Sequence, residues 1–284
     1  VDMTSISGDA TKTFTVTADV TFAGTLHGSI KTSVNSGVTL TSTALIATGK
    51  TIDGAGSVAL TALHSDLDAD LSLITASGGI TAAFGATDTF IGNLGTATVT
   101  VGNGFVMTAA ANKVDGASGP TINKAGGGDG ALAVLIGTAD AAVDMTSISG
   151  DATKTFTVTA NVSFTGTLAA TTSVASNATL TLTAAKATGK TIAGADANVS
   201  QTGGSIIVTG LGASQVSLTG LSAGGAGSGT AGTVTAGVST NAVLHSSTAL
   251  GDAIVSVDSG VTLTLTSAQA NNQTISGAGG VTIN

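Results

Sequence analysis

The sequence predicts an all-β protein, a parallel β-helix (β-solenoid) built of stacked coils. Three observations lead to this fold class: the chain repeats itself, its apolar residues alternate with Thr, and Gly-rich turns separate the alternating stretches. The composition agrees, because every acidic residue is Asp and every basic residue is Lys. Exposed helical faces usually carry Glu and Arg as well, so their absence favours strands.

The internal repeat divides the chain in two. Residues 1–18, VDMTSISGDATKTFTVTA, recur without change as residues 143–160. Self-similarity of this kind is typical of a solenoid or a tandem array. We therefore assign a first long repeat to residues 1–142 and a second to residues 143–284. The second diverges after about residue 202 and is expected to continue the same solenoid.

A shorter module lies inside the long repeat and leaves one alternative fold open. It starts at Ser33, Ser173 and Ser256, with a diverged copy near Val101. Starts at intervals of roughly 70 to 85 residues also match tandem β-sandwich modules. Sandwich cores usually contain a large aromatic residue, whereas this chain has no Trp, no Tyr and a single Pro. The composition therefore favours the solenoid.

Period-two alternation marks the strands. Apolar residues alternate with Thr or Asp from Phe14 to Phe22, and the pattern returns from Phe156 to Phe164. Such alternation predicts a strand with one buried face, with the Thr on the opposite face toward solvent or a partner. The residues expected to point inward are Val16, Val20, Leu40, Val158, Val162, Leu180, Val261 and Leu263.

The spacing of strands sets the size of a coil. Strand centres near Phe22, Leu40 and Leu60 lie 18 and 20 residues apart, which is about one coil of a parallel β-helix. The chain would then hold roughly fourteen coils, stacked at about 4.8 Å.

Charge and hydropathy exclude two classes of partner. The net charge of -8 and the pI near 4.4 argue against nucleic acid, because phosphate binding needs clustered Lys and Arg. The longest apolar run, residues 131–136, is far too short to span a bilayer. Membrane insertion is therefore not expected.

Two segments carry a resemblance to known families. SGVTLTLT (residues 259–266) and GKTIDGAGSVALT (residues 49–61) resemble the β-strand repeats of very large bacterial cell-surface proteins of the adhesin-like and filamentous-haemagglutinin-like families. The bias toward Thr, Ala, Gly and Asp resembles bacterial S-layer proteins. The resemblance implies an extracellular or cell-surface location and a structural or adhesive role. It carries over no functional residues.

The leading hypothesis is therefore a structural repeat segment of a secreted bacterial surface filament, sheath, S-layer or giant adhesin. Its terminal coils should expose unpaired backbone groups and apolar side chains, which template further pairing. The segment from Lys124 to Ala142 precedes the second long repeat but not the first, so we expect each end to meet another β-layer. The expected partners are further copies of the protein, or the rest of a longer chain, together with cell-surface glycans.

The rival hypothesis is a ligand-binding module, with calcium as the ligand. Asp66, Asp68 and Asp70 would share one face if they lay on a strand. Ca²⁺ prefers oxygen ligands of this kind, and no other cofactor is indicated. The alternative for these residues is a solvated acidic edge that blocks unwanted strand pairing.

Ice binding and catalysis rank lower. Outward Thr rows resemble the ice-binding face of solenoid antifreeze proteins, but the TLTLT stretches are separated by coils of other sequence. An enzyme ranks last: His27, His64 and His245 are scattered, and no nucleophile, phosphate-loop or metalloprotease motif is present. No catalytic residue is predicted.

Overall fold

Stacked parallel strands build this chain, as the sequence predicts. The computed structural model describes residues 2–6, 12–116 and 119–284. It is a β-solenoid of about 13 turns with all-parallel sheets and little helix. Two compact units are present, one formed by Val1–Val134 with Ser147–Lys154 and the other by Leu135–Thr146 with Thr155–Asn284. We call them unit 1 and unit 2 and describe each by itself.

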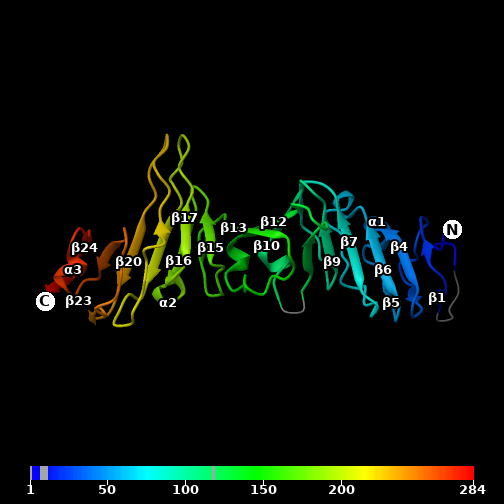
Figure 1. The fold of residues 1–284 in the computed structure, drawn as a ribbon, viewed down its shortest axis with the longest axis horizontal. Helices are drawn as coiled ribbons and strands as arrows, with labels where there is room; N and C mark the ends of the chain where they lie inside the picture. The colour runs from blue at the N-terminus through cyan, green and yellow to red at the C-terminus, as the bar shows by residue number, and fades with distance from the viewer. Residues whose placement is uncertain (1, 7–11, 117–118) are drawn as a thin grey trace. The chain divides into compact units, whose positions relative to one another are not determined.

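Unit 1 contains two parallel sheets and one further pair of parallel strands, with hydrogen-bonded strands side by side (Figure 1). The first sheet joins β1 (Thr13–Val16), β3 (Lys31–Val34) and β5 (Ile52–Gly54). The second has the order β11 (Thr121–Lys124), β9 (Thr98–Val101), β7 (Ile80–Phe84), β6 (Ser57–Thr61), β4 (Thr39–Thr43) and β2 (Val20–Thr21). The pair is β8 (Asp88–Phe90) with β10 (Val106–Ala110). Short helical turns are α1 (Ala44–Ala47), η1 (Leu63–Ser65) and η2 (Ala111–Lys113).

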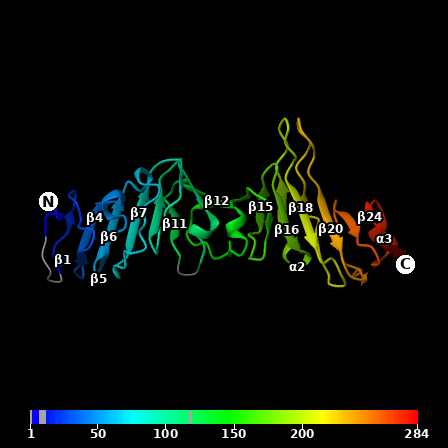
Figure 2. The ribbon, with the colours of Figure 1, turned by 180° about the vertical axis from the view of Figure 1, so that it is seen from behind.

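Unit 2 has the same construction (Figure 2). One sheet contains β13 (Thr153–Val158), β15 (Thr171–Val174), β17 (Thr191–Gly194) and β19 (Leu221–Ser222). A second joins β14 (Val162–Ser163), β16 (Thr179–Thr183), β18 (Ser205–Thr209), β20 (Val234–Val238), β22 (Ile254–Val257) and β24 (Ile275–Gly277). A third joins β21 (Ala242–Val243), β23 (Thr262–Leu265) and β25 (Gly280–Ile283). The helical turns are η3 (Thr138–Asp140), α2 (Ala184–Ala187) and α3 (Ser267–Ala270), and β12 (Ala131–Ile136) contains the boundary between the units.

The core of each unit is a set of columns, because strands in parallel register place equivalent side chains above one another. One column of unit 1 is buried along its whole length, with every member at most 2% exposed: Ser42, Leu60, Ala82, Val99 and Ile122. Unit 2 has a column of the same kind, in which Leu182, Val208, Ala236 and Val255 are buried and the terminal Ile275 is half-buried. The buried columns are filled mainly by small and medium aliphatic side chains, in agreement with the simple composition.

The predicted inward set is buried at six positions; Val20 points inward in register with Leu40 but is uncovered, and Val261 is half-buried. Val16, Leu40, Val158, Val162, Leu180 and Leu263 are buried. Val20 is 38% exposed, because no described turn lies on the outer side of β2. Its equivalent Val162 is buried, since the preceding turn closes over β14 through bonds from the N–H groups of residues 165 and 166 to the Ala141 carbonyl. Val261 is half-buried because it closes the turn before β23, where its N–H donates to the Asp258 backbone carbonyl.

The single strand predicted from Phe14 to Phe22 is also wrong. The chain leaves β1 at Val16, turns a corner through residues 17–19, and enters β2, which belongs to a different sheet. The alternation continues across the corner, so periodicity alone does not reveal the break.

A side-chain oxygen at this corner connects neighbouring turns. In three copies of the module an Asp or Asn Oδ1 accepts a hydrogen bond from a Thr N–H one turn later. The pairs are Asp19 with Thr39 at 2.8 Å, Asn161 with Thr179 at 2.9 Å, and Asn241 with Thr262 at 2.7 Å. These bonds satisfy the backbone donor of the first residue of each strand.

A projection distinguishes unit 2. Two residues, 55–56, connect β5 to β6, whereas residues 195–204 connect β17 to β18 and residues 223–233 connect β19 to β20. These two long connections extend beyond the strands as neighbouring loops (Figures 1 and 2). They approach backbone to backbone, since a Cβ on Gly203 would lie 2.5 Å from the Gly224 carbonyl oxygen and one on Gly224 would lie 1.9 Å from that of Ala195.

Candidate functional site

The predicted acidic row does not form, because its residues are not on a strand. Leu63 is fully buried at the start of η1, and the helical turn carries the chain to Asp66, whose N–H donates to the Leu63 carbonyl at 3.1 Å. Residues 67 and 68 form a turn, and Asp70 makes an isolated parallel bridge with Asn93. The three carboxylates therefore do not line up at two-residue intervals on one face.

The Asp70 carboxylate accepts hydrogen bonds within its own local turn. Its Oδ1 accepts hydrogen bonds from the Ser72 N–H at 3.0 Å and from the Ser72 hydroxyl at 2.7 Å. These two bonds hold the pKa of Asp70 below its usual range. The same Asp-x-Ser/Thr turn occurs at Asp2 and Asp144, so the residue type at position 70 is explained by local structure.

Asp66 is the most buried of the three acids. Asp66 is only 9% exposed, and its Oδ2 is buried without a hydrogen-bond partner. Burial raises the pKa of the Asp66 carboxyl, and the neighbouring Asp68 raises it further through a hydrogen bond and charge repulsion. Asp68 itself is exposed. Within the described ranges, no group of three or more His, Asp, Glu or Cys side chains is placed to hold a metal ion. Calcium binding by the three predicted residues is untested and stays a prediction.

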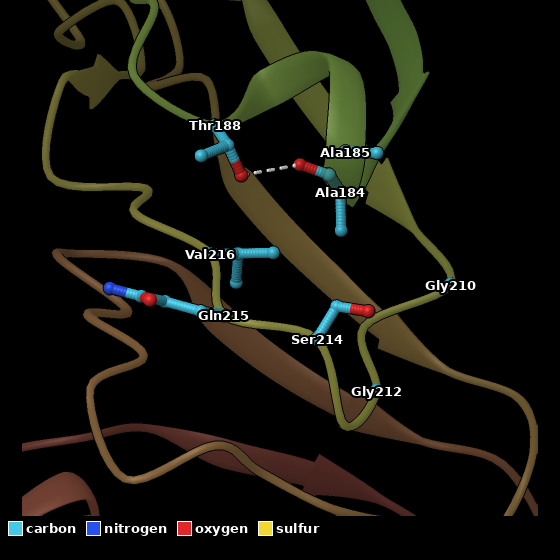
Figure 3. A pocket seen from close by; sticks show the side chains of 8 residues that line it. All are labelled: Ala184, Ala185, Thr188, Gly210, Gly212, Ser214, Gln215 and Val216. Atoms are coloured by element: carbon cyan, nitrogen blue, oxygen red, sulfur yellow. Dashed lines mark hydrogen bonds between the residues drawn. The ribbon is translucent and has the colours of Figure 1, made fainter.

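The equivalent corner of the second copy is neutral and hollow. Leu211 takes the place of Leu63, and Ser217, bridged to Ala249, takes the place of Asp70. Between them the second copy has residues 212–216, one fewer than residues 64–69 of the first, and none of them is an acid. Ser214 and Gln215 lie across from α2, and together with Ala184, Ala185, Thr188, Gly210, Gly212 and Val216 they line a hollow of about 300 Å³ (Figure 3).

The side chains that line this hollow are mostly small, and none is charged. The Thr188 hydroxyl donates to the Ala184 carbonyl at 2.9 Å, as the dashed line in Figure 3 shows. The remaining polar groups in view are the Ser214 hydroxyl and the Gln215 amide. Sequence reasoning missed this corner, although aligning the second module with the first would have shown the acidic-to-neutral exchange.

A second feature is an outward sheet face in unit 1, which we call the Thr face. Its central column is formed by residues that are all exposed or half-buried and lie in register: Thr21, Thr41, Ala59, Thr81, Thr98, Thr121 and Ser149. Beside it, Thr43 pairs with Thr61, and Ala83 with Thr100 and Asn123. The coils of other sequence therefore bring Thr, Ala or Ser into the same column, which the sequence alone did not indicate.

The corresponding column of unit 2 is interrupted by apolar residues. It contains Ser163, Thr181, Ile207, Thr235 and Ile254 in register. Ile207 is 37% exposed. Only unit 1 thus presents an extended Thr lattice among the described residues.

Comparison with protein-family models, with curated proteins and with solved structures finds no match for this chain. Among the described residues, no helix has the length and hydropathy needed to cross a bilayer.

Proposed function

We propose that this chain is a structural repeat segment of a secreted bacterial surface filament, sheath, S-layer or giant adhesin, extended by β-layers that cover its sheet edges. The observation that supports the proposal lies in β25. Val281 and Ile283 are 43% and 56% exposed, although they stand in register with Leu263 and Leu265, which are buried. The inward columns of unit 2 thus continue into an uncovered edge.

An uncovered edge of this kind favours further pairing. Burying Val281 and Ile283 would contribute about 1 kcal/mol each, since each is roughly half exposed. The backbone N–H and C=O groups on the free side of β25 would gain partners at the same time. A second copy of the chain, or a further turn of a longer chain, meets both requirements. Head-to-tail contacts give open filaments when their rotation does not close into a ring.

The association is tested with the 284-residue chain by sedimentation velocity and negative-stain microscopy at micromolar concentration. We expect elongated end-to-end assemblies. The double variant Val281→Lys, Ile283→Lys should be monomeric, because it places two charges where the next layer packs. Thr282→Lys is the matched control: Thr282 lies between them in β25 and faces outward, so assembly should persist. A wild-type monomer with β24 and β25 protected from hydrogen exchange would contradict the proposal.

An extracellular location follows from the same proposal and rests on the resemblance to surface-protein repeats. As part of an adhesin, the segment would bind cell-surface glycans. Limited proteolysis of intact cells of the source organism tests the location, since a surface protein is cleaved without lysis and an internal one is not.

The Thr face supports a second candidate function, binding to an ordered surface such as ice. Thr is β-branched and nearly fixed at χ1 on a strand, so its hydroxyl and methyl groups repeat with the backbone. The repeat is about 4.8 Å between turns and about 6.6 Å between alternate residues of one strand. No charged residue interrupts the columns from Thr21 to Asn123. A regular, uncharged lattice can order surface water into the spacing of ice.

Inhibition of ice recrystallisation tests the second candidate. Thr98→Lys, in the centre of the Thr face, should abolish inhibition. Thr235→Lys is a matched control, because Thr235 is also half-buried and outward but lies in the interrupted column of unit 2. Absence of inhibition by the unmodified chain, or equal loss in both variants, would exclude this function.

A further inference from the structure

A polar pocket, which we call the Asn pocket, lies at the base of the first long connection of unit 2, residues 195–204. It has a volume of about 260 Å³. Two of the residues that line it, Ala178 and Gly203, are buried. The remaining lining residues are polar, and none carries a charge: Asn161, Asn177, Thr179, Thr202 and Ser205. The pocket can therefore recognise a ligand mainly through neutral hydrogen bonds.

Backbone contacts fix the orientation of the two Asn amides. The Asn161 Oδ1 accepts the Thr179 N–H at 2.9 Å, and the Asn177 Oδ1 accepts the Thr202 N–H at 2.8 Å. Both Asn side chains are exposed. An amide whose oxygen is held in this way presents its NH₂ group as the remaining donor. Two donors in fixed positions thus face the pocket before any ligand arrives.

Three hydroxyl groups complete the set of polar groups. The Ser205 hydroxyl accepts the Thr233 N–H at 3.2 Å, and Thr179 and Thr202 add a hydroxyl each. A hydroxyl both donates and accepts. Phosphate and carboxylate ligands are disfavoured, because no lining residue is a cation and the chain carries a net charge of -8. A neutral ligand with several hydroxyl groups matches these donors and acceptors.

We propose that the Asn pocket binds one neutral sugar residue of a glycan. The Asn161 and Asn177 amides donate to hydroxyl oxygens of the sugar, and the pocket hydroxyls donate or accept beside them. The inference rests on the adhesive role proposed above, to which it adds the place on the chain and the class of sugar. No aromatic side chain lines the pocket to stack on a sugar ring. Binding of a single sugar is therefore weak, with a Kd on the order of 1–10 mM.

The other two modules provide an internal comparison, because they lack parts of this pocket. Two residues, 55–56 in the first module and 278–279 in the third, connect the strands where unit 2 has residues 195–204. The two Asn positions also differ. They are occupied by Asp19 and Gly37 in the first module and by Asn241 and Gly260 in the third. One sugar site per chain is therefore expected, in unit 2.

Saturation-transfer difference NMR of the full chain tests the proposal. The probes are methyl β-galactoside, methyl α-glucoside and methyl α-mannoside at about 10 mM, and saturation should pass to the ring protons of at least one of them. Asn161→Asp should weaken binding by about 2- to 12-fold, because it removes one amide donor. This variant is expected to fold, since Asp19 makes the same backbone bond at 2.8 Å in the first module. Asn177→Gly should also weaken binding, and Gly37 has the same left-handed backbone. Asn241→Asp is the matched control at the corner without the pocket and should leave binding unchanged.

Three results would overturn the proposal. One is the absence of saturation transfer to all three glycosides. Another is an unchanged Kd in Asn161→Asp and Asn177→Gly, or an equal loss in Asn241→Asp, with the fold intact by circular dichroism. The third is tighter binding of N-acetylneuraminic acid, an anionic sugar, than of the neutral glycosides. Saturation transfer is observed with monomers and filaments alike, so a failure of assembly through β25 would leave the result of this test unaffected.

Discussion

Replacing Thr172 with Val should stabilise unit 2. Thr172 lies in β15, pairs with Ile192 of the next turn, and is 1% exposed. Its hydroxyl oxygen has no hydrogen-bond partner. A hydroxyl buried in this way loses its bonds to water and gains nothing in return.

The magnitude follows from the two changes that the substitution makes. Removing an unsatisfied buried hydroxyl relieves a penalty of about 1–3 kcal/mol. The methyl group that replaces it adds roughly 0.8 kcal/mol of apolar burial. Because Val and Thr have the same branched shape, little repacking is needed. Allowing for partial relaxation of the native site, we expect a net gain of about 1–2 kcal/mol.

Native-state hydrogen exchange is the appropriate assay, because long repeat arrays do not unfold as one two-state unit. A gain of about 1–2 kcal/mol corresponds to exchange slowed by roughly 5- to 30-fold in β15 and β17. Thr181→Val is the control: Thr181 lies in β16 on the outward side and is half-buried, so its effect should stay within about 0.5 kcal/mol. Unchanged or faster exchange in Thr172→Val would refute the reasoning.

Three further outcomes are expected. Gly204→Ala should destabilise the projecting loops, because its Cβ would fall 2.2 Å from a backbone oxygen. Gly212→Ala should be tolerated, because its Cβ meets nothing nearer than 4.0 Å. Proteolysis at residues 195–204 should therefore be faster in Gly204→Ala and unchanged in Gly212→Ala. Asn161→Ala should cost about 0.5–1.5 kcal/mol by removing the bond to the next turn, measured by exchange in β14 and β16; no change would mean that water replaces the bond. Ser72 lowers the pKa of Asp70, so the stability from this turn is present above the unfolded pKa and is lost as the pH falls through the lower, folded value. Asp70→Asn should remove that part of the acid sensitivity, and an unchanged pH profile would contradict the assignment.

Much of the fold could be predicted from sequence because strand periodicity is a local property. Leu40 and Leu180 each stand between two Thr residues, and a one-residue slip in register would turn every apolar side chain of the strand outward. The register is therefore strongly determined wherever one face is buried. The repeat likewise implies that each module packs on a similar module, and the lack of Trp and Tyr favoured a solenoid over tandem sandwiches.

The corners were decided by tertiary structure. Nothing in the alternation from Phe14 to Phe22 shows that the chain changes sheets at residues 17–19, because the inward-outward pattern is preserved across the turn. At Asp66 the buried Leu63 closes a helical turn that period-two reasoning could not anticipate. The turn at residues 67 and 68 that follows keeps the three acids from lying along one strand.

The Thr face shows the same division between local and long-range information. The sequence determines that Thr41 and Thr98 point outward on their own strands. Whether they share a column depends on the lengths of the connections between β4, β6, β7 and β9, which set the register of each strand on the next. Periodicity thus determined the direction of each side chain, and stacking decided its neighbours, because side-chain direction is a property of one strand and a column is a property of many.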